Sequence, residues 1–354
     1  MKTSAGGHLP SLDGLRAISI VLVLVGHLNG TRNFGVFPIK EWLGNIAHLG
    51  VVVFFVISGF LITSLLTKEH SRRGSVSLKL FYARRALRIF PASFALIGVV
   101  AALSAAGVIV LHRYDLIHAL TYTINFSPER SWWLGHLWSL SVEEQFYMLW
   151  PFAFAALGPR KALWVAVLAI ALGPVARASS WYFLRGSPWR DTPLFPVVMD
   201  SIAVGCLLAL LRDWLEQQAW YKRVFEPRWS LLLLVALFLV NRLMDYTVVS
   251  VVGSCFTNIA LAILIHRSVY LSGDAMGRIL NWKPLVFLGT LSYSLYLWQQ
   301  LFLNRTSTAW VNAFPQNLIL AILVALASYV LLERPLMRFR ERLRSEPVAQ
   351  SVAV

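Results

Sequence analysis

The sequence predicts an all-helical protein that crosses a membrane about ten times. Of its 354 residues, 57% are apolar and only 14% are charged, and the mean hydropathy is +0.63. Water-soluble domains contain about a quarter charged residues, so this composition excludes a soluble enzyme and a disordered chain. The 14 Trp, 11 Tyr and 21 Phe residues supply the aromatic content typical of membrane–water interfaces. We therefore expect a polytopic bundle of transmembrane helices.

Ten segments are apolar over the roughly 20 residues that a helix needs to cross a bilayer. We expect the spans at residues 12–30, 46–66, 90–111, 137–157, 161–177, 193–211, 229–247, 249–267, 284–304 and 316–336. Gly173-Pro174 interrupts the end of the fifth segment, which predicts a tilted or broken helix there. One residue separates the seventh segment from the eighth, so the turn between them is short.

Basic residues set the expected orientation. With a cytoplasmic N-terminus, 22 of the 32 Lys and Arg residues fall in cytoplasmic segments, nine fall in outer segments, and Arg16 lies within the first span. Lys and Arg are enriched on the cytoplasmic side of membrane proteins, so both termini are predicted to be cytoplasmic. We expect one integral-membrane domain over residues 1–340 and a basic, disordered cytoplasmic tail over residues 341–354.

The net charge of +15 has the same explanation. Basic residues of a membrane protein face anionic lipid headgroups, and no basic helix free of apolar flanks is present to bind nucleic acid. Cys206 and Cys255 fall in separate apolar spans, where a cysteine is more often a packing residue than a ligand or nucleophile. The sequence shows no metal-ligand cluster, phosphate-binding glycine loop or nucleotide fingerprint.

Two ionisable residues share one face of the first span. Arg16 and His27 are eleven residues apart, close to three whole helical turns, and this separates them by about 16 Å along the axis. Arg16 alone would be explained by snorkelling to the inner interface. His27 lies too deep to snorkel, and an ionisable side chain inside a span is costly unless it is paired or faces water, which makes His27 a functional candidate. The pair predicts a polar cavity that extends through much of the bilayer.

A second polar stripe opens the fourth span. His136, Glu143 and Tyr147 are spaced by seven and four residues, so they share a face if the segment is helical. Adjacent carboxylates also suit a helix N-terminus, which explains Glu144 better than Glu143.

A third group lies at the inner end of the third span. Arg85 and Arg88 are three residues apart and adjacent on a helix, where they could bind the phosphates of a donor through charge-assisted hydrogen bonds. A topology signal explains such a basic run equally well.

Together these stretches resemble the acyltransferase-3 family of integral-membrane O-acyltransferases. The similarity covers residues 10–335 and rests on Leu12-Asp13-Gly14-Leu15-Arg16 with His27, on Gly50 to Phe60, on Tyr82 to Pro91, on Trp138 to Tyr147, on Ser292 to Trp298 and on Glu333-Arg334-Pro335. Each motif is weak alone, but together they occur in the order that the family has.

The resemblance implies a ten-helix domain that takes an acyl group, usually acetyl, from cytoplasmic acyl-coenzyme A. The acceptor would be a hydroxyl of a cell-surface glycan, a lipid-linked saccharide or a related glycosylated molecule. No cofactor would be bound permanently, and acetyl-CoA would be the cosubstrate. Membrane lipids would be partners, the location a bacterial cytoplasmic (inner) membrane, and the oligomeric state, a homo-oligomer included, stays open.

The residue chemistry assigns roles within this scheme. A histidine in a low-dielectric cavity can act as a base or a nucleophile, so we expect His27 to be catalytic with Glu143 and Arg16. The donor-binding residues are expected to be Arg16, Ser58, Arg85 and Arg88. Glu143 would fix a histidine tautomer or assist proton removal. The acceptor-side residues are expected to be Trp138, His136, Ser141 and Tyr147.

Two departures and one rival interpretation accompany this scheme. Gln299 stands where members of the family often have a histidine, and Leu49 replaces the first glycine of a pair. Because an amide cannot transfer protons, essential acid–base chemistry is not expected at Gln299. The alternative function is a transporter or flippase for a small polar solute or lipid-linked sugar, since buried Arg, His and Glu residues also line solute pathways.

Overall fold

A computed structural model describes residues 9–35, 46–227, 230, 232, 235, 236, 251, 253–271 and 273–345, and this part of the chain is helical and contains no strand. Six of its helical segments are long and apolar enough to cross a membrane. The main helices are α1 (Pro10–Leu28), α3 (Ile46–Arg73), α4 (Leu78–Ala105), α7 (Leu137–Phe183), α8 (Phe195–Leu215), α12 (Ser254–Tyr270), α14 (Lys283–Phe302), α15 (Gln316–Ser328) and α16 (Arg334–Ser345).

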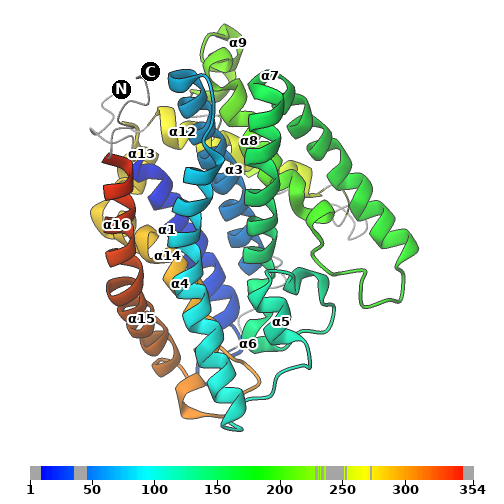
Figure 1. The fold of residues 1–354 in the computed structure, drawn as a ribbon, viewed down its shortest axis with the longest axis vertical. Helices are drawn as coiled ribbons and strands as arrows, with labels where there is room; N and C mark the ends of the chain where they lie inside the picture. The colour runs from blue at the N-terminus through cyan, green and yellow to red at the C-terminus, as the bar shows by residue number, and fades with distance from the viewer. Residues whose placement is uncertain are drawn as a thin grey trace, which may run out of the picture.

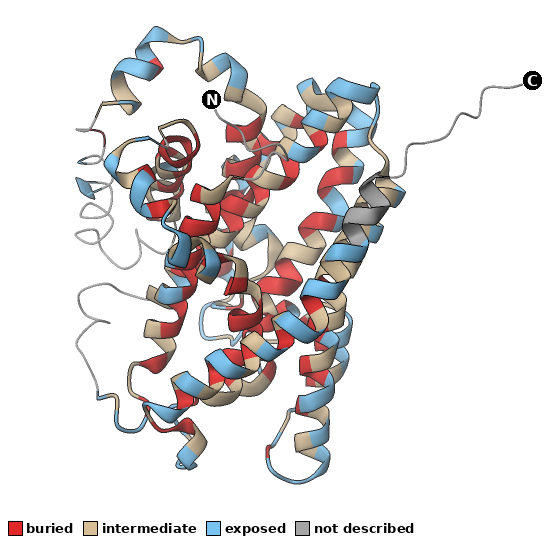
Figure 2. Ribbon diagram, turned by 90° about the vertical axis from the view of Figure 1, so that its left-hand side faces the viewer, coloured by how far each residue is buried: buried red, intermediate tan, exposed pale blue. Residues whose placement is uncertain are grey.

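The helices run up and down along the long axis of the molecule (Figure 1). α1 packs against α3 and α14, and α8 packs against α3 and α7. The start of α1 and the end of α16 lie at the same end of the bundle, which we call the terminal end. The short helices α5 (Asp115–Leu120) and α6 (Trp132–Gly135) lie at the far end. Buried residues follow the helix faces that meet inside the bundle (Figure 2).

The third and fourth predicted spans differ from the observed helices. α4 begins at Leu78, twelve residues before the expected start, because Ser77 caps its first turn by accepting a hydrogen bond from the Leu80 amide. The basic run around Arg85 is therefore helical. α7 contains both the fourth and the fifth expected spans, and its two halves run in opposite directions (Figure 1). The reversal is at Gly158, whose φ of 72° suits glycine and which is followed by Pro159. The helix continues through Gly173-Pro174, where we expected a tilted or broken helix.

The last predicted spans are seen in part. Residues 229–247, the expected seventh span, lie almost entirely outside the described residues, and the eighth is represented by α12. The tenth continues from α15 through a π-helical turn, η4 (Tyr329–Glu333), into α16. Since α16 ends at Ser345, it extends five residues beyond the predicted domain boundary, and residues 346–354 lie outside the described part.

Close backbone contact fixes α1 against α14. A Cβ atom added to Gly289 of α14 would collide with the carbonyl group of Asp13 on α1. One added to Gly14 of α1 would collide with the carbonyl group of Leu280, the last residue of α13 (Ala275–Leu280), the short helix that precedes α14. Small residues allow such close approach of helices within a membrane. This contact holds in fixed register the helix that carries Arg16 and His27 and the helix that carries Gln299.

Arg177, the last residue of the fifth expected span, is buried. Its guanidinium group forms two hydrogen bonds of 2.9 Å with the carboxylate of Asp200 on α8. The Nδ2 atom of Asn258 on α12 also donates to this carboxylate, at 3.2 Å. The buried ion pair therefore joins α7, α8 and α12, which offsets the cost of placing both charges inside the bundle.

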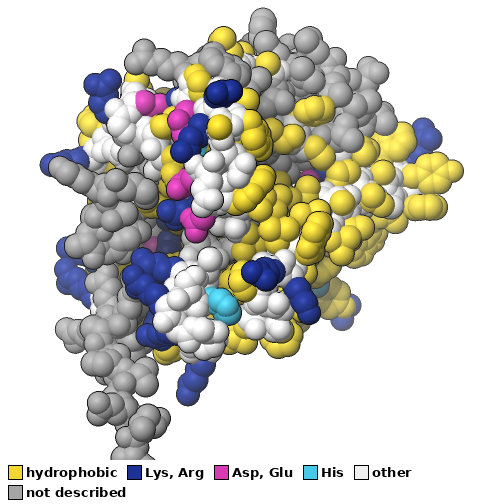
Figure 3. Space-filling model, turned by 90° about the horizontal axis from the view of Figure 1, so that it is seen from above, with side chains coloured by type: hydrophobic (Ala, Val, Ile, Leu, Met, Phe, Trp, Pro, Cys, Tyr) yellow, Lys and Arg dark blue, Asp and Glu magenta, His cyan; other side chains and the backbone are white. Residues whose placement is uncertain are grey.

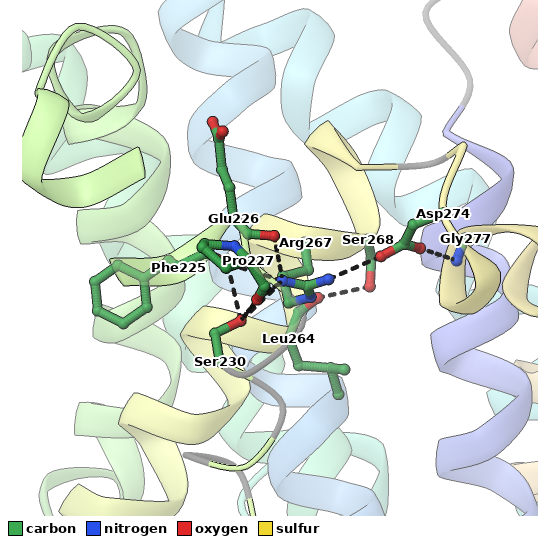
Figure 4. A network of polar contacts seen from close by, with 9 residues as sticks. All are labelled: Phe225, Glu226, Pro227, Ser230, Leu264, Arg267, Ser268, Asp274 and Gly277. Carbon is green, nitrogen blue, oxygen red and sulfur yellow. Dashed lines mark hydrogen bonds and ion pairs between the residues drawn. The ribbon is translucent and has the colours of Figure 1, made fainter. Parts of the chain in front are cut away.

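A second buried arginine holds the segment after α9 (Ala219–Phe225) against α12 (Figure 4). Arg267 is only 1% exposed, and its Nη2 atom lies 2.8 Å from a carboxylate oxygen of Asp274. Its Nη1 atom lies within 3.0 Å of Ser230 Oγ and of the carbonyl oxygens of Phe225, Glu226 and Pro227. Asp274 also accepts a hydrogen bond from the Gly277 amide, which caps α13 (Ala275–Leu280).

Arg267→Leu is expected to lower the free energy of unfolding by roughly 3–5 kcal/mol. The substitution leaves Asp274, Ser230 and three carbonyl oxygens without their shared donor. Thermal unfolding in detergent measures the effect. Arg278→Leu is the control, because Arg278 is an exposed arginine on α13 and its loss should change stability by no more than about 0.5 kcal/mol. Equal melting temperatures for the two variants would contradict a structural role of the network.

Candidate active site

Two cavities follow each other along α1. The first, the histidine pocket, has a volume of about 270 Å³ and is lined by Val23, His27, Ala47, His48, Val51, Arg130, Ser131, Trp132, Gly135, His136, Trp138, Tyr296 and Gln300. The second, the arginine pocket, has a volume of about 80 Å³ and is lined by Arg16, Val51, Phe54, Phe55, Ser58, Arg85, Arg88, Ile89, Ser139, Leu140, Glu143, Ser292, Tyr293 and Tyr296. The arginine pocket is nearer the terminal end, because Arg16 precedes His27 on α1.

His27 is held by a chain of amide groups. Its Nδ1 atom lies 2.8 Å from Oε1 of Gln299, a fully buried residue of α14. The Nε2 atom of Gln299 donates to Oε1 of Gln300 at 3.3 Å, and Nε2 of Gln300 donates to the carbonyl oxygen of Trp132 at 2.6 Å. The indole of Trp132 donates back to the carbonyl oxygen of Gln300 at 2.9 Å and meets the His27 ring edge-on at 5.5 Å between centroids.

This chain determines which nitrogen of His27 carries a hydrogen. The carbonyl oxygen of Trp132 can only accept, so the amide group of Gln300 must turn its NH₂ toward it. Gln300 Oε1 then accepts from Gln299, and Gln299 Oε1 is left to accept from His27. In the neutral imidazole the hydrogen is therefore on Nδ1, and Nε2 keeps a lone pair. Such an Nε2 atom can accept a proton or attack a carbonyl carbon.

The rest of the histidine pocket offers unused polar atoms. His136 Nε2 lies 3.0 Å from the carbonyl oxygen of Leu297, so the hydrogen is on Nε2 and Nδ1 is an acceptor. In the described part of the chain neither His136 Nδ1 nor Ser131 Oγ, both buried, has a hydrogen-bond partner. His48 stacks on Trp138, with ring planes 17° apart. Buried polar atoms are normally satisfied, so these atoms are suited to a bound polar ligand or ordered water.

Arg130 gives the histidine pocket a positive charge. Burial lowers the pKa of this guanidinium group, and Tyr296 and Asp115 act in the opposite direction. Nη1 of Arg130 donates to the carbonyl oxygen of Ser127 at 2.8 Å. Among the described residues, those that line this pocket include no Asp or Glu, and this lining favours a neutral or anionic ligand.

The arginine pocket combines three arginines with one carboxylate. Ser58 Oγ donates to Glu143 at 2.6 Å, and the hydroxyl of Tyr147 donates to Ser58 Oγ at 3.0 Å. The guanidinium carbon of Arg85 lies 3.5 Å from the centre of the Tyr147 ring, a cation–π contact. Arg16 contacts Asp13 at 3.2 Å on its own helix. With Arg16, Arg85 and Arg88 opposed by Glu143 within the pocket, the lining favours anionic groups.

Comparison with known proteins is consistent with this arrangement of motifs. A family model described as an acyltransferase domain (Acyl_transf_3) matches residues 9–333, nearly the whole chain. The chain belongs to the acyltransferase-3 family. Among curated relatives of Staphylococcus aureus, a protein of strain COL named "Putative O-acetyltransferase" is 29% identical over 361 residues, and O-acetyltransferase OatA of strain NCTC 8325 is 28% identical over 367 residues.

The matched part of these acyltransferase-3 relatives is limited. Each alignment covers 93% of this chain but 57% of the relative, so the chain corresponds to a little over half of their length. No solved structure matches the chain.

The acyltransferase-3 motifs converge on the two pockets. Arg16 and His27 of the first motif line the arginine and histidine pockets, respectively. Arg85 and Arg88 line the arginine pocket together with Ser58 and Glu143. His136 and Trp138 line the histidine pocket. In the last two motifs, Ser294 donates a hydrogen bond to Glu333 and so connects α14 with η4.

Three predicted residues lie elsewhere than their expected roles require. The carboxylate of Glu143 accepts a hydrogen bond from Ser58, and the side chain that hydrogen-bonds to His27 is that of Gln299. Tyr147 lies beside Ser58 and Arg85 and does not line the histidine pocket. Ser141 lines neither pocket, because its hydroxyl donates to the Leu137 carbonyl oxygen of its own helix at 3.0 Å. The stripe of His136, Glu143 and Tyr147 extends from one pocket to the other: His136 lines the histidine pocket, and Glu143 and Tyr147, which come later in the chain, lie on the arginine side.

Several residues of the site were not expected from the sequence. In the sequence, Gln299 is only a departure from the histidine that the family often has at this position. Its place directly after Trp298 of a family motif is the one feature that points to the site. Trp132, Arg130 and Tyr296 enter the site through the folding of the far-end loop and of α14. Among the described residues, no three His, Cys, Asp or Glu side chains gather to hold a metal ion.

Proposed function

We propose that this protein is a membrane O-acyltransferase that moves an acyl group, with acetyl as the expected group, from cytoplasmic acyl-CoA to a hydroxyl of a cell-surface or lipid-linked saccharide. The observation that carries the proposal is His27, whose Nε2 lone pair is set by Gln299 and whose pocket adjoins a pocket lined by three arginines. The O-acetyltransferase names of the relatives support the reaction and favour acetyl as the group.

In the proposed reaction, His27 acts as a general base for direct transfer of the acyl group from the thioester to the acceptor. The acceptor hydroxyl lies in the histidine pocket and gives its proton to His27 Nε2 as its oxygen attacks the thioester carbonyl carbon. The carbon–sulfur bond then breaks, the bonding electrons leave with sulfur, and the proton on Nε2 passes to the departing thiolate. The products are an acyl ester and free CoA, and His27 returns to its starting state. A positioned base of this kind contributes about 10²–10⁴-fold to the rate.

The donor side follows from charge. CoA carries several phosphate groups, and Arg85 and Arg88 lie near the start of α4, at the same level of the bundle as Arg16. Arginine binds phosphate oxygens with paired, charge-assisted hydrogen bonds, whereas the single carboxylate of the pocket is engaged by Ser58. These side chains would hold the phosphates while the pantetheine arm extends toward the histidine pocket.

The exposed basic residues support one orientation in the membrane. Lys and Arg side chains gather on the terminal end of the molecule (Figure 3). They include the exposed residues Arg72, Arg73, Lys79, Arg160, Lys161, Lys222, Arg223, Arg278 and Lys283. The positive-inside rule supports a cytoplasmic terminal end, a donor that enters from the cytoplasm, and an acceptor that reaches the far end from outside. A multi-pass protein of ten spans in a bacterial inner membrane is consistent with this arrangement.

The proposal is tested with purified protein in lipid vesicles, radiolabelled acetyl-CoA and a set of methyl glycosides. Acyltransfer predicts free CoA together with label on a glycoside or as acetate released to water. Acetyl-CoA consumption that requires the protein supports the proposed acyltransferase activity. A folded protein that neither binds nor consumes acetyl-CoA would contradict it and favour a transporter, which vesicle uptake of labelled sugars would then reveal.

Arg85→Gln is expected to raise the KM for acetyl-CoA at least about tenfold, because one paired phosphate contact is lost. Arg84→Gln is the matched control, since Arg84 precedes it on α4 but does not line the arginine pocket. Initial rates over a range of acetyl-CoA concentrations give the KM of each variant. Equal KM values for the variants would exclude Arg85 from donor binding.

A further inference from the structure

Arg130 and Ser131 bring polar groups into the histidine pocket from the segment just before α6. α6 lies at the far end of the bundle, from which the acceptor is expected to arrive (Figure 1). The proposed reaction uses His27 of this pocket, and it uses neither Arg130 nor Ser131. Both residues are therefore candidates for holding the part of the acceptor that does not react.

The side chain of Arg130 is held in place with donors to spare. Its Nη1 atom donates to the carbonyl oxygen of Ser127 at 2.8 Å. The side chain lies along Gly135, because a Cβ atom added there would be 3.7 Å from Cγ and 3.8 Å from Cδ of Arg130. In the described part of the chain, no group accepts a hydrogen bond from its Nε or Nη2 atom. A guanidinium group has five N–H donors, so most of them remain for a ligand or for water.

The positive charge of Arg130 is not cancelled by a direct contact within the described residues. Asp115 is the carboxylate whose charge acts on Arg130, but no ion pair joins the two side chains there. The Oδ2 atom of Asp115 instead accepts hydrogen bonds from the backbone amides of His112, at 2.9 Å, and Ser131, at 3.1 Å. A ligand in the pocket therefore meets a guanidinium group that is free to bind an anion.

Ser131 supplies a further donor directly after Arg130. The residue is only 7% exposed, and its Oγ atom has no hydrogen-bond partner among the described residues. A serine that precedes a helix often caps it, but this side chain makes no such bond to α6. The backbone of Ser131 is fixed, because its amide donates to Asp115 and its carbonyl oxygen accepts from the Gly135 amide at 2.9 Å. The hydroxyl can therefore bind a ligand without losing another contact.

We infer that Arg130 and Ser131 bind a carboxylate of the acceptor, so that the acceptor is an acidic saccharide, an inference that rests on the proposed function. The planar guanidinium group matches the two oxygens of a carboxylate, and the serine hydroxyl adds another donor. His136 Nδ1 can only accept, so it suits a hydroxyl of the same sugar. The pocket thus offers donors for a carboxylate and an acceptor for a hydroxyl, and a uronic acid carries both groups.

The test measures sugar binding to the purified full chain in detergent, without acyl-CoA. Methyl glycosides of uronic acids are compared with their neutral counterparts in the gluco, galacto and manno series, which have a hydroxymethyl group in place of the carboxylate. Titration followed by saturation-transfer NMR gives each Kd. Wild type is expected to bind at least one uronate about tenfold or more tightly than its neutral counterpart, the usual effect of a charge-assisted hydrogen bond.

Arg130→Gln should remove this preference and leave the affinity for the neutral glycoside within about twofold. Arg130→Lys should keep part of the preference, because it retains the charge without the planar fork. Ser131→Ala, which serves as a second variant should Arg130→Gln fail to fold, should reduce the preference about threefold. Arg113→Gln is the matched control, because Arg113 is an exposed arginine just before α5, lies over the Tyr114 ring and lines neither pocket.

The inference is overturned if wild type binds no uronate better than its neutral counterpart, or if Arg130→Gln and Ser131→Ala keep the wild-type preference. It is also overturned if Arg130→Gln lowers the kcat of acyl transfer equally for acidic and neutral acceptors while uronate binding is unchanged. That result would place Arg130 beside the reacting carbonyl group. Uronate binding by a protein that does not consume acetyl-CoA would support the carboxylate subsite and overturn the proposed function, so the two failures are distinguishable.

Discussion

Replacing His27 with alanine is expected to lower kcat/KM for acyl transfer by about 10³-fold, because the variant lacks the base that takes the acceptor proton. Affinity for acetyl-CoA should change little, since the arginines of the donor pocket are untouched and His27 lies in the other pocket. The measurement is CoA release and label on the methyl glycoside in vesicles, with acetyl-CoA binding determined separately. Loss of transfer with retained binding is the result that the geometry predicts.

The matched control is His70→Ala. His70 lies on α3 with its ring against Phe154 and lines neither pocket, so the same change of side chain there should leave transfer within about twofold. Both variants must show wild-type melting temperatures in detergent. Full activity of a folded His27→Ala protein would remove this residue from the chemistry and leave the pocket as a binding site alone.

The helical periodicity of the sequence predicted where single helices turn their polar faces. Arg16 and His27 were placed on one face of the first span, and both indeed line the cavities that follow α1. Arg85 and Arg88 are likewise adjacent in one pocket. Such predictions succeed because the helical repeat fixes the relation of residues three, four, seven or eleven apart. The all-helical fold could be predicted from composition for a different reason: a segment that crosses lipid must satisfy its own backbone hydrogen bonds, and a helix does so.

The contacts between helices could not be obtained in this way. His27 and Gln299 are 272 residues apart, and their contact depends on the register in which α1 packs against α14. The partner of Glu143 is Ser58 for the same reason, although the stripe alone favoured a histidine. The partner of Arg177, Asp200, lies on a different helix, and nothing in the pattern along α7 indicates it. A helix has several neighbours, and the pattern along one helix does not say which neighbour its polar face meets.

Helix ends were the other source of error. Hydropathy marks the apolar part of a helix and not its capped end, so α4 begins well before its apolar run, at the Ser77 cap. The presence of proline alone also did not predict where the helix is interrupted. Pro174 is accommodated within α7, whereas the chain reverses at Gly158, where the backbone adopts a positive φ before Pro159. Gly158 can leave the helical conformation at little cost because it has no side chain. In addition, Pro159 disfavours the helical conformation of the residue before it, which is Gly158.

The kcat of Gln299 variants is expected to depend on whether the new side chain accepts or donates a hydrogen bond, and not on its size. Gln299→Leu removes the acceptor for His27 Nδ1, so the ring loses its preferred tautomer and orientation, and kcat should fall roughly ten- to a hundredfold. Gln299→Lys offers only donors, which favours a lone pair on Nδ1 and a hydrogen on Nε2. Because this is the wrong tautomer for a base, kcat should fall by about 10³-fold or more. Gln299→Glu keeps an acceptor at the same reach and should retain the most activity of the three.

This order separates a positioning residue from a packing residue. Gln299 is fully buried, and a residue that only fills space would lose activity in proportion to the lowered melting temperature, with leucine tolerated best among the three substitutions. The order Glu, Leu, Lys at matched stability has no such explanation. It would mean that the carbonyl oxygen of Trp132, acting through Gln300 and Gln299, determines the protonated nitrogen of His27. Activity of Gln299→Lys equal to that of Gln299→Leu would show that the amide chain does not control the ring.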